Sequence, residues 1–194
     1  MRILRANNYR RMRWKNGGGE TTEIIVSPDG ASLETFDWRV SMAHVATDGP
    51  FSLFPGIDRT IAVLDGNGIR LRVDGIGEMA LTKERAPFAF PADAGAGADL
   101  IDGPIHDLNV MSRRGVVRHT LSRAVMGEPT RIAASGDAVL VLVQGGGARI
   151  EAGAIRDTLS DGDSVLLPAV HEDIMMTPVT TLTLYTAVFQ RANT

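Results

Sequence analysis

The chain repeats one order of apolar runs and turn residues, and this repeat limits its fold more than any other feature. In the first copy an apolar run leads into a glycine turn at Gly66, and a later short run ends at Pro91. The corresponding positions in the second copy are Gly145 and Pro168. The glycines lie 79 residues apart and the prolines 77. Such self-similarity predicts two related β modules, each with a strand, a hairpin turn, a returning strand and a short closing strand.

Short strands are indicated along the whole chain. The 21 glycines and 9 prolines fall at short intervals between runs of alternating or β-branched residues, which is typical of an all-β protein. The clearest strand is the last, where Leu182 and Leu184 alternate with threonines at period two. The predicted strands cover residues 22–27, 38–45, 60–64, 69–73, 107–112, 116–122, 138–143, 164–167 and 180–189.

A turn at residues 160–163 followed by an apolar run that ends at Pro168 resembles the cupin pattern of a small antiparallel β-barrel. With the repeat, this predicts a bicupin, in which two cupin-like antiparallel β-barrel or jelly-roll modules are packed in one body over residues 1–194. We place the modules at residues 1–113 and 114–194 and leave open that strands exchange between them. Another all-β sandwich with glycine turns is the alternative.

Composition and charge exclude several classes of function. The 23 acidic and 20 basic residues give a net charge of −3 and a pI of 5.8, so the basic surface of a nucleic-acid-binding protein is not expected. The absence of cysteine excludes thiolate chemistry and cysteine-ligated metals. No apolar run has the length of a signal peptide or a membrane span, and we therefore expect a cytoplasmic protein without a membrane partner.

No metal site or other cofactor is expected. Metal-dependent cupins resemble one another in a His-x-His pair that puts two imidazoles on one strand face, and this sequence has no such pair. Its histidines are far apart in the sequence, at His44, His106, His119 and His171.

Two predicted strands carry polar residues on one face. Arg39 and Ser41 alternate with apolar residues on the first strand. On the second, the residues that share a face are Asp107, Asn109, Met111 and Arg113. Solvent exposure and a pocket both remain open as interpretations. Guanidinium, amide and hydroxyl groups together suit the recognition of a small carboxylate.

Four blocks in this order resemble the HutD/Ves family. They are residues 14–21 (WKNGGGET), 36–43 (FDWRVSMA), 48–59 (DGPFSLFPGIDR), and 102–104 (DGP) with 107–113 (DLNVMSR). The resemblance implies a bacterial cytoplasmic bicupin without the metal-binding histidines of other cupins. For the HutD branch it also implies an association with histidine utilisation and a small acidic ligand such as N-formyl-L-glutamate. For the Ves branch it implies a stress-induced protein of unknown activity.

These blocks coincide with the polar strands and with a glycine-rich loop, and together they predict a ligand pocket. In it, Arg39 or Arg113 would hold a carboxylate, and Asn16 and Asn109 would orient an amide or formyl group. The full set of expected ligand-binding residues is Trp14, Lys15, Asn16, Arg39, Ser41, Phe51, Asp58, Arg59, Asn109 and Arg113.

The leading functional hypothesis is a metal-independent protein that binds a small acidic metabolite. An alternative is a metal-independent enzyme acting on a similar acid, with Lys15 or Asp58 as the proton-transfer group. A third is an interaction protein that self-associates, for example as a homodimer. The sequence does not decide whether the protein is an enzyme.

Overall fold

The computed structural model describes residues 1–14, 17–169 and 172–192. Within these ranges the regular elements are β-strands and one short 3-10 helix, η1 (Ala6–Asn8). The predicted all-β fold class is confirmed, and each predicted strand overlaps an observed one. None of the helical segments in the described ranges is long and apolar enough to cross a membrane.

The chain forms two compact units, which we describe separately. Unit 1 comprises Met1–Tyr9 and His119–Thr194, and unit 2 comprises Arg10–Arg118. The first nine residues therefore belong to the same unit as the C-terminal part of the chain.

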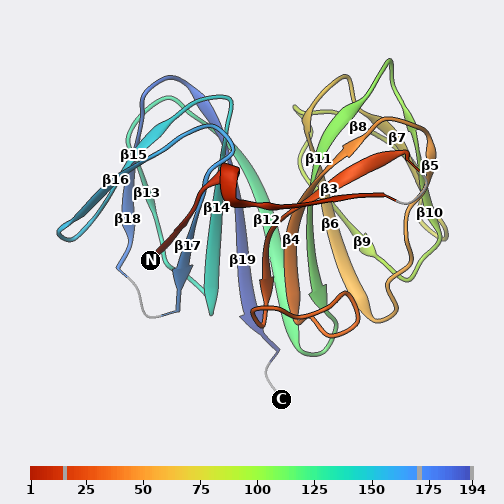
Figure 1. Cartoon of the computed structure of the whole chain (residues 1–194), viewed down its shortest axis with the longest axis horizontal. Coiled ribbons are helices and arrows are strands. Elements are labelled where there is room, and N and C mark those ends of the chain that lie inside the picture. Colours follow the sequence, from red (N-terminus) through yellow and green to blue (C-terminus); the bar gives the residue numbers. More distant parts are fainter. Residues whose placement is uncertain (15–16, 170–171, 193–194) are drawn as a thin grey trace. The chain divides into compact units, whose positions relative to one another are not determined.

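Unit 2 contains two antiparallel sheets (Figure 1). The large sheet has the strand order β2-β3-β4-β11-β6-β9, and the small sheet has the order β5-β10-β7-β8. The strands of the large sheet are β2 (Arg10–Arg13), β3 (Gly19–Ser27), β4 (Trp38–Val45), β11 (Ile105–Arg113), β6 (Ile57–Asp65) and β9 (Phe88–Pro91). Those of the small sheet are β5 (Gly49–Pro50), β10 (Ala96–Leu100), β7 (Ile69–Val73) and β8 (Gly77–Leu81).

Unit 1 contains a five-stranded sheet, β1-β17-β14-β19-β12, and a four-stranded sheet, β13-β18-β15-β16. The strands of the five-stranded sheet are β1 (Arg2–Leu4), β17 (Ser164–Pro168), β14 (Ala138–Gln144), β19 (Leu182–Arg191) and β12 (Val117–Met126). Those of the four-stranded sheet are β13 (Thr130–Ile132), β18 (Ile174–Pro178), β15 (Ala148–Ala152) and β16 (Ile155–Leu159).

The two units share one topology, which confirms the predicted duplication. The orders β4-β11-β6-β9 and β5-β10-β7-β8 in unit 2 correspond to β12-β19-β14-β17 and β13-β18-β15-β16 in unit 1. Gly66 and Gly145 occupy equivalent hairpin turns with φ of +91° and +80°. A side chain at Gly66 would place its Cβ 2.6 Å from the carbonyl oxygen of Pro104, so this turn requires glycine.

Residues 1–9 are tied to unit 1 by buried polar contacts. The carboxylate of Asp163 accepts hydrogen bonds from the backbone N–H of Ala6 at 2.8 Å and from Arg5 Nη1 at 2.9 Å. The hydroxyl of Tyr9 lies 2.8 Å from Ser164 Oγ and 3.0 Å from the carbonyl oxygen of Gly162. Asp163 and Ser164 are buried polar side chains of unit 1, and both contact this segment. Their polar groups therefore have a structural role.

Candidate functional site

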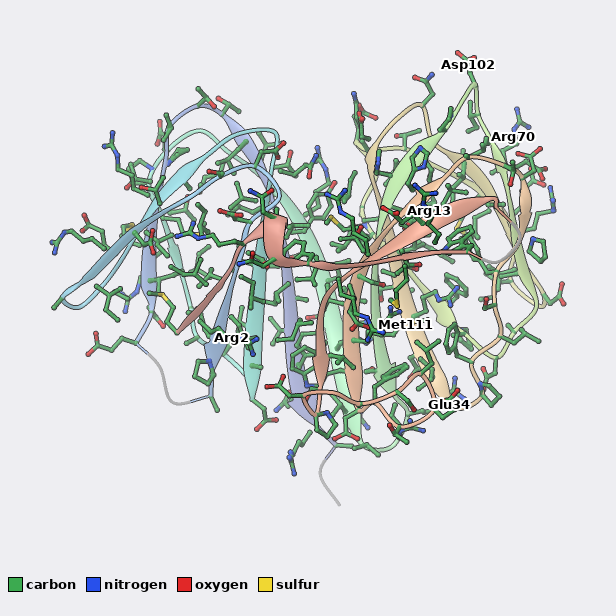
Figure 2. All side chains as sticks on the ribbon, viewed as in Figure 1. Arg2, Arg13, Glu34, Arg70, Asp102 and Met111 are labelled. Carbon is green, nitrogen blue, oxygen red and sulfur yellow. The ribbon has the colours of Figure 1, made fainter. Side chains whose placement is uncertain are left out.

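Unit 2 differs from unit 1 because charged side chains are buried on its large sheet. Met111 on β11, which is labelled in Figure 2, is paired with Arg39 on β4 and with Arg59 on β6 in the strand register. Two residues along, Asn109 lies opposite Ser41. Asp107 lies opposite Ala43 and Val63, and Glu23 on β3 lies opposite Ser41. Paired residues and alternate residues share one face of a sheet, so these polar groups lie on one face. We call them the polar layer, which consists of Glu23, Arg39, Ser41, Arg59, Asp107 and Asn109.

Apolar neighbours on the same face show that the polar layer points into unit 2. Ala43, Ile61 and Val63 share that face and belong to a core cluster with the inward residues of the small sheet. Met111 also lies on this face and belongs to a second cluster, with Phe36. The polar layer therefore adjoins two apolar clusters inside the unit. A charged group there is poorly solvated and needs a partner.

Arg39 has such a partner. Its Nε donates a 2.6 Å hydrogen bond to Glu23 Oε2, and the two side chains are 7% and 16% exposed. Its Nη1 lies 3.4 Å from Ser41 Oγ. This charge is therefore balanced within the protein.

Arg59 is buried without a bonded counter-ion among the described residues. Its Nη2 donates to the carbonyl oxygen of Ser52 at 3.3 Å, and its Nε has no hydrogen-bond partner in the described part of the chain. Its Cζ lies 5.4, 5.3 and 5.8 Å from the ring centroids of Phe51, Phe54 and Phe90. Burial lowers its pKa to about 10, although nearby Asp107 opposes this shift. A guanidinium with an unused N–H donor in an apolar environment is suited to bind an anion.

Asp107 is the fully buried acid of the polar layer. Its Oδ1 accepts a 2.7 Å hydrogen bond from Asn109 Nδ2. Burial raises its pKa to about 7, and the charge of Arg59, the backbone of Ala43 and the side chain of Asn109 limit the shift. Near neutral pH this carboxyl group can therefore gain or lose a proton.

The structure places several of the predicted site residues together. Arg39, Ser41, Arg59 and Asn109 all belong to the polar layer, and Phe51 lies over the guanidinium of Arg59. Trp14 packs against the core cluster that includes Ala43, and its Nε1 donates to Thr21 Oγ1 at 2.8 Å. Lys15 and Asn16 lie outside the described residues.

Asp58 and Arg113 have other partners. Asp58 and Arg59 are neighbours on β6, so their side chains lie on opposite faces of the sheet. The carboxylate of Asp58 forms a 2.8 Å ion pair with Arg114. The guanidinium of Arg113 donates to the carbonyl oxygens of Phe36 at 3.0 Å and Glu34 at 2.8 Å. Neither residue contributes to the polar layer.

Sequence reasoning did not select Glu23, Asp107, Phe54 and Phe90 as site residues. The sequence did contain a signal for Asp107. It lies two and four residues before Asn109 and Met111, so all three share the polar face predicted for this strand. The other three contact Arg39 or Arg59 through strand pairing and loop packing. The sequence contains no direct sign of those contacts.

An open hollow of about 570 Å³ forms a second feature of unit 2. His44 and His106 are paired across β4 and β11, and their ring centroids lie 4.8 Å apart. Burial and the neighbouring His44 lower the pKa of His106, while Asp65 opposes this. The described residues contain no group of three or more side chains arranged to hold a metal ion. The lining residues are Arg13, Trp14, Gly17, Gly19, Glu20, His44, Ala46 and His106.

Comparison with known proteins identifies the family. The model of the HutD family matches residues 6–182. The chain belongs to the HutD family. A 21.2 kDa uncharacterised protein encoded in the region 3′ of hutC in Pseudomonas putida is 43% identical over 111 residues, which are 57% of each chain. Protein Ves of Citrobacter koseri is 42% identical over 103 residues, 52% of each chain. This HutD-family chain thus spans somewhat more than half the length of the curated relatives that it matches.

Solved structures agree with this assignment. The structure of HutD from Pseudomonas fluorescens SBW25 in a formate condition has a TM-score of 0.82 and 31% identity, covering 99% of both chains. A cupin 2 conserved barrel domain protein from Leptotrichia buccalis has a TM-score of 0.60 and 10% identity, covering 92% of this chain and 95% of its own. The latter likeness concerns the fold alone. The predicted HutD/Ves membership and cupin-like fold are therefore confirmed.

Proposed function

We propose that this HutD-family protein is a metal-independent binding protein for a small carboxylate, which is held by Arg59 in unit 2. The observation that carries the proposal is the buried guanidinium of Arg59, whose Nε lacks a partner in the described residues and whose Cζ lies 5.3–5.8 Å from three aromatic ring centroids. A carboxylate accepts two parallel N–H bonds from such a fork. Exclusion of water by the rings strengthens the attraction.

Membership of the HutD family supports a role in histidine utilisation, and N-formyl-L-glutamate is our proposed ligand. Its carboxylates match the cation, and its formamide matches the neutral hydrogen-bonding groups of Asn109 and Ser41 in the same layer. Formate is a suitable minimal probe, because it presents the carboxylate alone and is named in the condition of the related HutD structure.

Isothermal titration of chelator-treated protein with formate and with N-formyl-L-glutamate tests this proposal. We expect saturable one-site binding of both, tighter for N-formyl-L-glutamate. Arg59→Met is expected to weaken the affinity more than about tenfold, because the charged fork is lost. Arg70→Met removes an exposed arginine on β7 and is the matched control, with unchanged affinity (Figure 2). Absence of binding, or equal binding by Arg59→Met, would contradict the proposal.

A second candidate function is a metal-independent hydrolase that uses Asp107 for proton transfer. It is favoured by the pKa of about 7 of this buried carboxyl group, which suits a general acid or base at neutral pH. Asp58 is less suited to this role, because it is half exposed and ion-paired with Arg114. Release of formate from N-formyl-L-glutamate by metal-free protein, with loss of turnover in Asp107→Asn, would favour the enzyme. Binding without turnover would exclude it.

A further inference from the structure

Arg59 and Asp107 form an incomplete charge pair in the polar layer. Both side chains are buried on the same face of the large sheet, and the positive charge of Arg59 opposes the rise in the pKa of Asp107 that burial causes. Their hydrogen bonds nevertheless go elsewhere: Arg59 donates to Ser52, and Asp107 accepts from Asn109. Among the described contacts, none joins the two charges directly. Arg59 therefore keeps an unused N–H donor in the same layer as the buried carboxyl group of Asp107.

Other charges around Asp107 are already balanced or absent. On the β4 side the charged group is Arg39, which is paired with Glu23 on β3. On the β6 side the charged group is Arg59. The small sheet contributes apolar residues to the adjoining cluster, among them Ile69 and Leu71 on β7. His106 precedes Asp107 on β11 and lies on the opposite face. Among the described groups of this interior, Asp107 therefore has a pKa raised to near neutral pH.

A ligand carboxylate would disturb this balance. Above about pH 7, ionised Asp107 offsets the positive charge of Arg59 when no ligand is bound. A second carboxylate bound to Arg59 would bring two negative charges close to one cation inside a poorly solvated interior. Two carboxylates that share such a site do not both remain ionised. Protonation of Asp107 relieves the repulsion, and its neutral form can still accept the hydrogen bond from Asn109.

We propose that the polar layer binds its carboxylate together with one proton, which Asp107 takes up. This inference rests on the proposed function and adds a regulatory property to the same site. The protein would then respond to the ligand and to pH together, with ligand held more weakly in an alkaline solution. Asp107 acts here as a positioning and charge-compensating residue.

One-proton coupling has a quantitative signature. The affinity for formate should be nearly constant below about pH 6, where Asp107 is already protonated. Above about pH 7 it should fall by about tenfold per pH unit, because each binding event must then recruit a proton from solution. Formate itself remains ionised throughout this range, so it does not contribute to the slope.

Calorimetric titration of the whole chain with formate at pH 6 and pH 8 tests the proposal. Each titration is repeated in two buffers that differ in ionisation enthalpy, so that the difference in heat counts the protons taken up. We expect uptake close to one proton at pH 8 and close to zero at pH 6. Asp107→Asn should abolish the uptake and make the affinity independent of pH. His106→Gln, which removes the neighbouring titratable group, is the control and should retain the uptake.

The possible outcomes separate the two proposals. Saturable binding with no proton uptake at pH 8 would overturn the coupling and leave carboxylate binding intact. Uptake that persists in Asp107→Asn would overturn the assignment to Asp107. Absence of formate binding at both pH values would overturn both proposals. The comparison of buffers on the unchanged protein remains decisive even if the Asp107 variant does not fold.

Discussion

Arg39 and Arg59 lie opposite the same residue, Met111, from the strands on either side of β11, yet their charges are balanced differently. Arg39 is bonded to Glu23 at 2.6 Å. Arg59 is surrounded by aromatic rings and keeps an unused donor among the described contacts. Two arginines in one cross-strand row therefore have different surroundings: one is ion-paired within the sheet, and the other keeps an N–H donor without a partner among the described residues.

Replacing each arginine by methionine should change stability in opposite directions. Arg59→Met removes a poorly solvated charge and keeps an apolar side chain among the rings, so we expect the free energy of unfolding to rise by about 1 kcal/mol at pH 6. Arg39→Met leaves Glu23 without its partner and should lower that free energy by about 2–3 kcal/mol. Urea unfolding measures both changes. A clear loss of stability in Arg59→Met would show that its charge is compensated within the protein.

Asp107 should make the protein less stable as pH rises from about 4 to 7. Its pKa is about 7 in the folded state and about 4 in the unfolded chain, so the folded state holds a proton that the unfolded state has lost. The bound proton of Asp107 therefore adds to the free energy of unfolding at low pH. This gain is lost as pH rises through the pKa of Asp107 in the folded state. The difference in unfolding free energy between Asp107→Asn and the unchanged protein should therefore shift in favour of the variant from pH 4 to pH 8. A constant difference over this range would contradict the predicted burial of the charge.

The face of a strand on which a residue lies follows from the sequence, whereas the partner of that residue does not. Because side chains alternate along a strand, Arg39 and Ser41 lie on the same face, whereas Asp58 and Arg59 lie on opposite faces. Only one of Asp58 and Arg59 can therefore face the interior. The pairing of Glu23 with Arg39 depends on the register of β3 and β4, which shifts between Glu23 and Ile25. Such an irregularity has no direct mark in the sequence.

The duplicated fold was predictable for a different reason. Glycine turns and strand-ending prolines recur at similar spacing, and each marks a position where the backbone has few alternatives. From the sequence, residues 1–9 are predicted to belong to the module 1–113, whereas they lie in unit 1 with the C-terminal part of the chain. Their position depends on contacts across more than 150 positions, such as that of Tyr9 with Ser164. Long-range side-chain contacts of this kind are decided by tertiary packing.

Tyr9→Phe should loosen the attachment of the N-terminal segment to unit 1. The hydroxyl of Tyr9 lies within hydrogen-bonding distance of Ser164 Oγ and of the carbonyl oxygen of Gly162. Its removal deprives the buried hydroxyl of Ser164 of a hydrogen-bond partner. We expect the free energy of unfolding to fall by about 1–2 kcal/mol. Hydrogen exchange at the amides of β1 and β17 should speed up at the same time. Formate binding in unit 2 serves as the control and should not change.

His106 should destabilise the protein as pH falls from about 7 to 5. Burial and the neighbouring His44 lower its pKa in the folded state, so the unfolded chain takes up a proton at a pH where the folded protein does not. The contribution of His106 to the free energy of unfolding is therefore complete above its pKa in the unfolded chain, about 6.5. It decreases as pH falls through the lower pKa of the folded state. This dependence has the opposite sign to that of Asp107.

His106→Gln should remove this part of the pH dependence while leaving stability at pH 8 nearly unchanged. His44→Gln should act in the same direction but less completely, because it removes the repulsive neighbour and leaves the burial of His106 in place. Urea unfolding at pH 5, 6 and 8 measures the slope, and the imidazole resonances followed by NMR identify the group that titrates. If His106→Gln kept the full slope, the acid sensitivity would have to arise at another group.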